Sequence, residues 1–222
     1  MGVAERKARE KLQRRDQIMD AAKQVFSRKG FGGATMEEIA QQAELSPATL
    51  YLYFKNKNDL YASLNLRMLE FLCQRVEKVA SKKDPDPLRK VRSLAEAMYD
   101  VYRFDPLTLT NVFHMQSSEA LRALSPEQQH LINDMAAQAL RTMADIFRDG
   151  MDQGVFQALH PVALADLVWS VFSGLVLWEE SKRLFDPRKD HLKPTLDLAM
   201  DLLARGLRVQ DPPAPAGGTR KA

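Results

Sequence analysis

The 222-residue chain has little of the chemistry on which enzymes and metal sites depend. It contains one cysteine, Cys73, and four histidines scattered along the chain, so neither a disulfide framework nor a zinc site of closely spaced ligands is expected. Cys73 is predicted to be a small buried apolar residue, with a redox sensor as the alternative. A glycine-rich phosphate loop, a G-x-S-x-G motif and an H-E-x-x-H motif are all missing. We therefore predict a protein that is not an enzyme and that has no metal site and no cofactor.

Strand patterns and targeting segments are missing as well. No alternating apolar run of useful length occurs, and no apolar stretch near the N-terminus has the form of a signal peptide. With 45% hydrophobic residues, the chain can bury a core as one large domain or two small ones. We expect an all-α, cytoplasmic protein. Residues 210–222 are rich in proline, glycine and alanine and are predicted to be disordered.

The most informative stretch begins at Thr35 and reads TMEEIAQQAELSPATLYLYFKNK. Thr35 and Glu38 form a T-x-x-E capping box, which starts a helix at about Met36. Ser46 and Pro47 start a second helix, because serine caps helix N-termini and proline is tolerated at the first helical position. Two short helices joined by a tight turn form a helix-turn-helix, whose second helix can enter a DNA major groove about 12 Å wide.

A third helix is predicted ahead of this pair. Apolar residues recur there at helical spacing and Gly30 follows as a stop signal. The resulting unit is predicted to span residues 12–57, preceded by a flexible basic arm, residues 1–11, that suits phosphate. Residues 1–60 carry a formal charge of +3 and the remainder is neutral. Short helices occur in every all-helical protein, and a solvated basic terminus is common, so these features support DNA binding without establishing it.

Residues 58–209 are predicted to form a larger helical domain. A long helix from about Asn58 to Lys83 would connect it to the first unit, and further helices are expected at 88–103, 106–115, 126–153, 161–183 and 193–209. The segment 162–178 is apolar nearly all round, but it is shorter than the roughly 20 residues of a membrane span and contains Asp166. We predict burial without membrane insertion, partly in a four-helix dimer interface with the last helix. A monomer that hides the same surfaces internally is the alternative.

At residues 12–62 the chain resembles the N-terminal signature of the TetR family of bacterial transcriptional regulators. The residues that match in order and spacing are Gly30, Phe31, Thr35, Ile39, Ala40, Ala43, Leu45, Ser46, Thr49, Leu50, Tyr51, Tyr53, Phe54, Lys57 and Leu60. Glu44 and Ala48 depart from the pattern, since glycine is usual at the first position and frequent at the second. A left-handed backbone at Glu44 would be strained. The resemblance implies a dimer whose larger domain binds a small-molecule inducer.

The resemblance also implies where DNA is contacted. Thr35, Tyr53 and Lys57 would hold phosphates, Thr35 at a helix N-terminus. The residues that would meet base edges or nearby phosphates are Ser46, Pro47, Ala48, Thr49, Tyr51 and Leu52. The exposed face of this helix has no arginine, lysine, asparagine or glutamine to read guanine or adenine with paired hydrogen bonds. We therefore predict apolar and hydroxyl contacts together with a share of indirect readout.

The predicted inducer site lies among methionine and aromatic residues of the middle helices, where the family holds its ligand. The candidates are Met98, Tyr102, Phe113, His114, Met143, Phe147, Trp169 and Phe172. Such residues at helical spacing usually form a core, so core packing is the alternative at each position. A pocket of this kind would suit a largely apolar inducer, with His114 or Tyr102 orienting a polar group.

These features favour a homodimeric repressor that binds a palindromic operator on double-stranded DNA and is released by an apolar inducer. A single recognition helix reads few base pairs, whereas a two-fold dimer reads half-sites about 34–36 Å apart or a multiple of that distance. In the alternative interpretation, the larger domain is a helical protein-interaction module and DNA binding is constitutive or lost.

Overall fold

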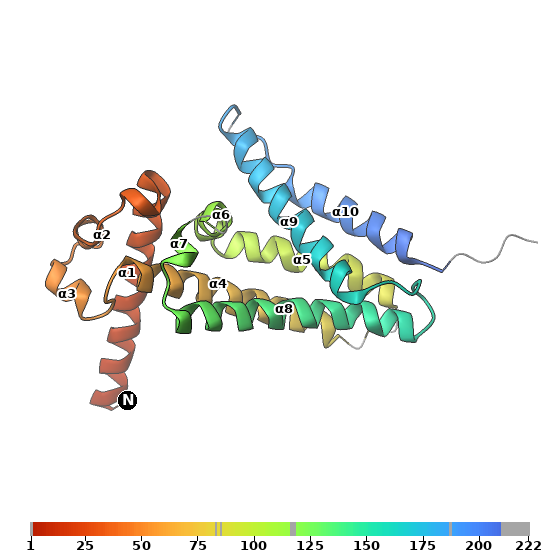
Figure 1. The fold of residues 1–222 in the computed structure, drawn as a ribbon, viewed down its shortest axis with the longest axis horizontal. Helices are drawn as coiled ribbons and strands as arrows, with labels where there is room; N and C mark the ends of the chain where they lie inside the picture. The colour runs from red at the N-terminus through yellow and green to blue at the C-terminus, as the bar shows by residue number, and fades with distance from the viewer. Residues whose placement is uncertain (1, 83, 85, 116–118, 187, 210–222) are drawn as a thin grey trace, which may run out of the picture.

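The computed structural model describes residues 2–82, 84, 86–115, 119–186 and 188–209 (Figure 1). Its helices are α1 (Val3–Gly33), α2 (Met36–Gln42), α3 (Pro47–Tyr51), α4 (Lys57–Ala80), α5 (Pro87–Phe104), α6 (Pro106–Met115), α7 (Glu119–Arg122), α8 (Pro126–Asp152), α9 (Pro161–Arg183) and α10 (Leu192–Leu207). Within the described ranges the β contact is a single isolated bridge between Phe156 and Arg208. The all-α prediction is confirmed. The predicted disordered tail lies outside the described residues.

Two hydrophobic cores share the helix α4. Figure 1 shows α1, α2 and α3 as a small body at one end, and α4, α5, α8, α9 and α10 as the larger body. The small core includes Ile18, Ala22, Val25, Phe26, Ile39, Ala40, Leu50, Phe54, Leu60, Tyr61 and Leu64. The larger core begins further along α4 with Met68, Leu72 and Val76, where α4 packs on α5 and α8. The helix α4 is therefore a common element of both cores.

The segment predicted to be a flexible arm is helical. The helix α1 begins at Val3, so residues 3–11 continue it, and the structure differs here from the sequence-based prediction. The physical reason is local, because alanine, glutamate, lysine and arginine favour helix and Arg6 pairs with Glu10 one turn later at 2.8 Å. Gly30 then interrupts α1 with φ of 69°, in agreement with the predicted stop signal.

The other helix boundaries agree closely with the sequence-based expectations. The helix α4 begins one residue earlier than expected, at Lys57, and ends at Ala80 instead of Lys83, with Ser81 as its C-cap. The short helix α7 was not predicted, and a four-residue segment is too short to show helical periodicity. The helices α6 and α9 have the predicted bounds, since proline marks the first position of each.

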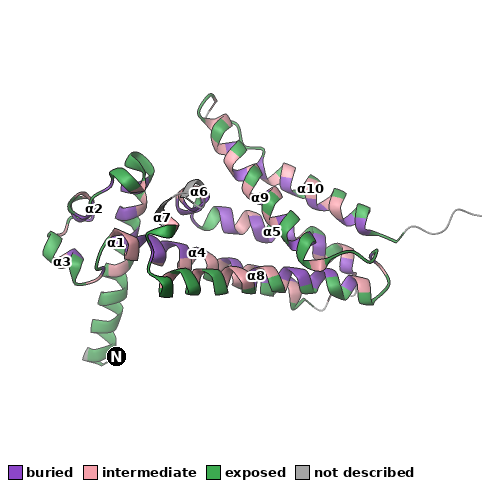
Figure 2. Cartoon of the chain, viewed as in Figure 1, coloured by how far each residue is buried: buried purple, intermediate pink, exposed green. Residues whose placement is uncertain are grey.

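Among the described residues, α9 is the one helix long and apolar enough to cross a membrane by length and composition. One face of α9 packs in the larger core through Leu164, Val168, Phe172 and Val176. The opposite face is exposed, as the alternating colours in Figure 2 show. The exposed apolar side chains of α9 and α10 include Val162, Leu167, Trp178, Leu198 and Leu202. Only part of the apolar circumference of α9 is therefore buried within a single chain.

Candidate nucleic-acid interface and ligand cavity

A reciprocal cap starts α2. The Glu38 backbone N–H donates to the Thr35 hydroxyl at 3.2 Å, and the Thr35 N–H donates to the Glu38 carboxylate at 3.3 Å. Lys29 also donates to this carboxylate and holds the pKa of Glu38 below its usual value. Thr35 is exposed, and its hydroxyl hydrogen is not needed for the cap. The residue can therefore donate to an anion while it caps α2.

The turn after α2 has a left-handed residue at Glu44, a position where glycine is usual in the resembling family. Glu44 has φ of 55° and is the only non-glycine residue with positive φ in the described part of the chain. The Leu45 N–H donates to the Ala40 carbonyl at 2.9 Å, and the Glu44 N–H donates to the Gln41 carbonyl at 3.1 Å. This pair of bonds is a Schellman motif, in which glycine is the usual residue at the left-handed position. The motif keeps its geometry at a cost in strain of about 1–2 kcal/mol.

The second helix, α3, presents an apolar outer face. Ser46 caps it by accepting from the Thr49 N–H at 3.1 Å, while Leu50 is fully buried and anchors the inner face. On the outside, the exposed fraction is 48% for Tyr51 and 81% for Leu52. Of the other predicted contact residues, Ser46, Pro47 and Ala48 are exposed, and Thr49 and Tyr53 are partly buried. Most of the predicted DNA-contact residues are therefore accessible to solvent.

Lys57 occupies a different environment from the phosphate site predicted for it. Its ammonium group donates to the carbonyls of Phe31 at 2.9 Å, Gly32 at 3.1 Å and Ala34 at 3.2 Å, and it lies 4.8 Å from the centre of the Phe31 ring. These bonds use all three ammonium hydrogens. Lys57 therefore ties the start of α4 to the C-terminal end of α1. The helical periodicity of the sequence could not predict this role of Lys57, because the contact joins residues 23 to 26 positions apart.

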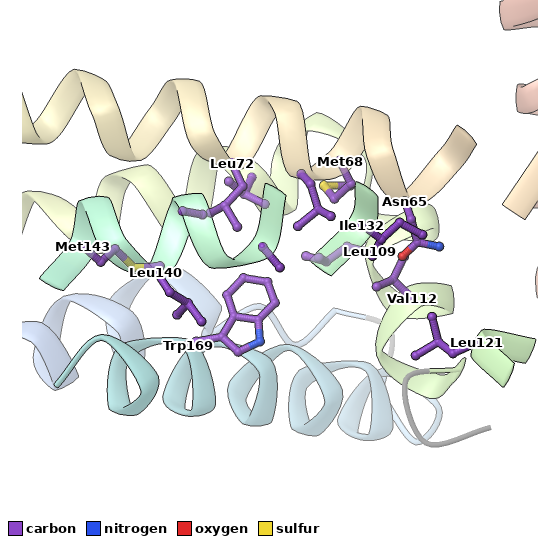
Figure 3. Close-up of a pocket in the computed structure, with 14 residues that line it drawn as sticks. Asn65, Met68, Leu72, Leu109, Val112, Leu121, Ile132, Leu140, Met143 and Trp169 are labelled. Carbon is purple, nitrogen blue, oxygen red and sulfur yellow. The ribbon is translucent and has the colours of Figure 1, made fainter. Parts of the chain in front are cut away.

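A cavity of about 140 Å³ lies in the larger body, lined by residues of six helices (Figure 3). Its lining residues are Asn65, Met68, Leu69, Leu72, Val101, Leu109, Val112, Leu121, Ile132, Ala136, Ala139, Leu140, Met143 and Trp169. Two of the predicted pocket residues, Met143 and Trp169, are among them. The aliphatic residues of α4 and α8 were not predicted, because their helical stripe looks the same whether they pack on a neighbour or face a void.

The remaining candidate pocket residues do not line this cavity. Met98, Phe147 and Phe172 are completely buried core residues. Phe113 packs edge-on against Trp169, with ring centres 5.6 Å apart, and so lies behind the cavity wall. The Tyr102 hydroxyl donates to Glu180 at 3.2 Å and accepts from Arg183. In this structure these side chains fill space between helices or hold helix ends, and their role in a ligand site remains a prediction. His114 belongs to α6, but its side chain lies outside the described part of the chain.

A buried carboxylate at the start of α6 joins the two bodies. Asp105 is 5% exposed and accepts from Lys23 of α1 at 3.1 Å and from Arg67 of α4 at 3.2 Å. It also caps α6 by accepting from the Thr108 N–H at 3.1 Å. Burial alone lowers the pKa of Lys23, but its hydrogen bonds to Asp20 and Asp105 outweigh this effect, so the pKa is raised. Because Leu109 and Val112 of α6 line the cavity, one short helix contacts both the cavity and the network that holds α1.

The first part of the chain matches a known protein family. Residues 18–64 match the family model of bacterial regulatory proteins of the tetR family. Over 154 residues the chain is 29% identical to the HTH-type transcriptional repressor NicS of Pseudomonas putida, and the aligned region covers 64% of this chain and 66% of NicS, slightly less than two thirds of that repressor.

Solved structures share the fold over most of the chain. The TetR family transcriptional regulator PfmR from Thermus thermophilus has a TM-score of 0.73 at 23% identity, over 86% of this chain and 99% of that chain. FadR from Bacillus subtilis, solved in complex with stearoyl-CoA, has a TM-score of 0.67 at 23% identity, over 86% of this chain and 98% of that chain. At these identities the solved structures establish the fold. Residues 18–64 therefore form a DNA-binding domain of the tetR family, and over most of its length the chain has the fold of TetR family transcriptional regulators.

Proposed function

We propose that this regulator is a homodimeric repressor that binds a palindromic operator on double-stranded DNA and leaves it when a small, largely apolar inducer enters the cavity. The observation that carries the proposal is that α4 belongs to both hydrophobic cores. Leu60 and Leu64 belong to the core that supports α3, and Met68 and Leu72 line the cavity. A ligand that changes the position of α4 in the larger body also changes the position of the recognition helix.

In this proposal the outer face of α3 enters the major groove. Ala48 and Leu52 meet base edges, where thymine methyl groups are the natural apolar partners, and Ser46, Pro47, Thr49 and Tyr51 lie against bases or adjacent phosphates. Thr35 and Tyr53 donate to phosphates. Lys57 acts indirectly, because its ammonium group fixes the end of α1. The exposed helical extension of α1 replaces the predicted flexible arm and offers Lys7 and Lys11 to the DNA backbone.

Two contacts would transmit occupancy of the cavity to the DNA-binding body. The first is α4 itself. The second is Asp105, which would move with α6 when a ligand displaces Leu109 or Val112 and would then shift Lys23 of α1. A ligand affects the equilibrium only as far as it prefers one of the two arrangements. A cavity of about 140 Å³ is small beside the roughly 300–1,000 Å³ of most ligand sites, so most inducers would have to move its walls.

The exposed faces of α9 and α10 are the proposed dimer interface. Leu167 and Trp178 lie on α9 and Leu198 and Leu202 on α10, so two copies would form a four-helix arrangement that covers these side chains. The small residue Gly174 lies on the same helix, and a methyl group added there would meet no atom within 4 Å in the single chain. A two-fold axis at this interface would place two recognition helices on the half-sites of a palindrome.

Relatives support the same proposal. NicS is named as a repressor, and the FadR structure holds stearoyl-CoA, a ligand with a long apolar chain. The alternative, a larger body that serves as a helical protein-interaction module with constitutive DNA binding, accounts for the exposed faces of α9 and α10 but assigns no role to the cavity.

The test is a binding selection followed by a mobility-shift assay with the full chain. Wild-type protein should select a palindromic sequence, and Leu52→Ala should change the preferred bases under α3. Leu159→Ala, at an exposed leucine far along the chain, is the matched control and should leave the selected sequence unchanged. A metabolite extract should release the wild-type protein from its site. Failure to bind any DNA at low salt would refute the proposal, and binding unaffected by any extract would favour the interaction module.

A further inference from the structure

The lining of the cavity indicates the charge of its ligand. Among the described residues that line it, none carries a charged side chain; thirteen are aliphatic, thioether or aromatic residues and one is an amide, Asn65. An ionised carboxylate or ammonium group placed there would lose its hydration without gaining a partner of opposite charge, which costs several kcal/mol. The nearby ion pairs, such as Asp105 with Arg67 and Asp100 with Arg75, are already formed between protein groups.

The polar capacity of the cavity is concentrated at one end. Asn65 is 4% exposed and forms one hydrogen bond, from its amide nitrogen to the Tyr61 carbonyl at 3.0 Å. An asparagine side chain offers two N–H donors and a carbonyl acceptor, so most of its capacity is unused among the described residues. The Tyr61 hydroxyl is also buried and lies close to the Asn65 amide without reaching hydrogen-bond geometry. Buried polar groups are normally paired, so the unused capacity of the Asn65 amide, which lines the cavity, points to a missing partner.

The shape of the cavity places a polar group at one end and an apolar body along the rest. Figure 3 shows Asn65, Val112 and Leu121 at one end and Met143 and Leu140 at the other. On α8 the lining runs from Ile132 to Met143, a length of about 16 Å at 1.5 Å per residue. The enclosed volume of about 140 Å³ is close to that of an engineered cavity that accepts benzene. The space is therefore long and narrow.

We propose that the part of the inducer that enters the cavity is electrically neutral, with a slender apolar body between α4 and α8 and a single uncharged hydrogen-bonding group, such as a hydroxyl or carbonyl, at Asn65. The inference rests on the proposed function and names the ligand class of the same site. A molecule whose acid or amine group must enter the cavity is excluded, whereas a charged group joined through a long linker can remain outside.

The experiment compares three molecules with the same tail: 1-octanol, octanoate and octylammonium, at pH 7 with the full chain. Trp178→Phe leaves Trp169 in the cavity wall as the one tryptophan, so its fluorescence reports binding. We expect 1-octanol to change the fluorescence and raise Tm at concentrations at least tenfold lower than either ion. Equal or tighter binding of octanoate or octylammonium, or failure of 1-octanol to bind, would overturn the proposal.

Two pairs of variants locate the binding. Ala136→Leu adds a side chain to the cavity and should abolish the effect of 1-octanol, whereas Ala137→Leu, next to it on α8 but outside the lining, should not. Asn65→Leu keeps a similar volume and should weaken 1-octanol by about three- to tenfold, as expected for one net hydrogen bond, while leaving toluene binding unchanged. Equal binding of 1-octanol by Ala136→Leu and Ala137→Leu would place the ligand elsewhere and refute the proposal.

DNA binding is measured separately, so the two proposals can fail independently. If 1-octanol binds with the stated preference but leaves the operator complex intact, the ligand class stands and ligand-controlled repression fails. If a charged molecule that enters the same cavity releases the operator, the regulatory proposal stands and the ligand class is wrong.

Discussion

The two cores that meet on α4 differ in how they are closed. In the DNA-binding body, polar groups close the helix ends, with Thr35, Ser46 and Asn56 as N-caps of α2, α3 and α4 and with Lys57 at the end of α1. The larger core instead encloses a cavity and leaves the Asn65 amide short of partners. The difference suggests different roles for the two bodies: the rigid DNA-binding body binds DNA, and the less densely packed larger body adapts to a ligand. Five predictions test whether the two bodies differ in this way.

The largest effect is expected from removing a leucine in each core. Leu50→Ala in the DNA-binding core should cost about 3–5 kcal/mol, because Leu50 is fully buried in contact with its neighbours on all sides. Leu72→Ala should cost less, about 2–3 kcal/mol, because Leu72 already borders empty space. Urea denaturation would measure both free energies of unfolding. Equal costs would show that the two cores are packed alike.

The next effect is expected at the contact between the bodies. Asp105→Asn removes the buried charge that Lys23 and Arg67 share, and we expect a loss of about 2 kcal/mol, since the two cations then keep only more exposed carboxylates such as Asp20. Asp16→Asn is the control, because Asp16 is mostly exposed and its carboxylate lies 3.7 Å from the Arg67 guanidinium.

The pH dependence of stability provides a second reading of this contact. The pKa of Lys23 is raised in the folded protein, so its contribution to stability is complete below the unfolded value near 10.5 and is lost as pH rises through the higher folded value. This alkaline loss should be smaller in Asp105→Asn. If stability falls equally at alkaline pH in the wild type and in Asp105→Asn, the result would argue against the Lys23–Asp105 pair.

A smaller effect separates the two roles considered for Lys57. Lys57→Met should destabilise the protein by about 1–3 kcal/mol by removing a charged donor from three carbonyls. If its role is to position α1, operator affinity falls but the slope of log affinity against log salt stays the same. A phosphate contact would instead reduce that slope by about one unit. Lys55→Met, at the exposed lysine two residues earlier, is the comparison variant.

The smallest effect is a gain in stability. Glu44→Gly should stabilise the protein by about 1 kcal/mol, because glycine adopts the left-handed conformation at Glu44 without strain. Glu37→Gly, in the first turn of α2, should destabilise it by up to a similar amount, because glycine is a poor helix former. Thermal unfolding of the two variants should therefore shift in opposite directions.

The sequence predicted the DNA-binding body better than the cavity, and the reason is the range of the interactions. Capping at Thr35 and Ser46 and strain at Glu44 depend on residues within a few positions, so they can be read from the chain. The three carbonyls around Lys57 and the ion pairs of Asp105 join distant segments, for which periodicity offers no signal. Aromatic side chains such as Phe147 were plausible pocket residues, yet tertiary packing placed them in the core.

The exposed leucine at the end of the recognition helix has a thermodynamic consequence. Leu52 keeps 81% of its surface in water when no DNA is present. Covering it with thymine methyl groups would release ordered water, so operator binding should carry a negative heat-capacity change beyond that of its phosphate contacts. A recognition helix with such side chains would gain relatively more of its sequence specificity from dehydration and less from charge. Its discrimination between DNA sequences would therefore strengthen with moderate warming.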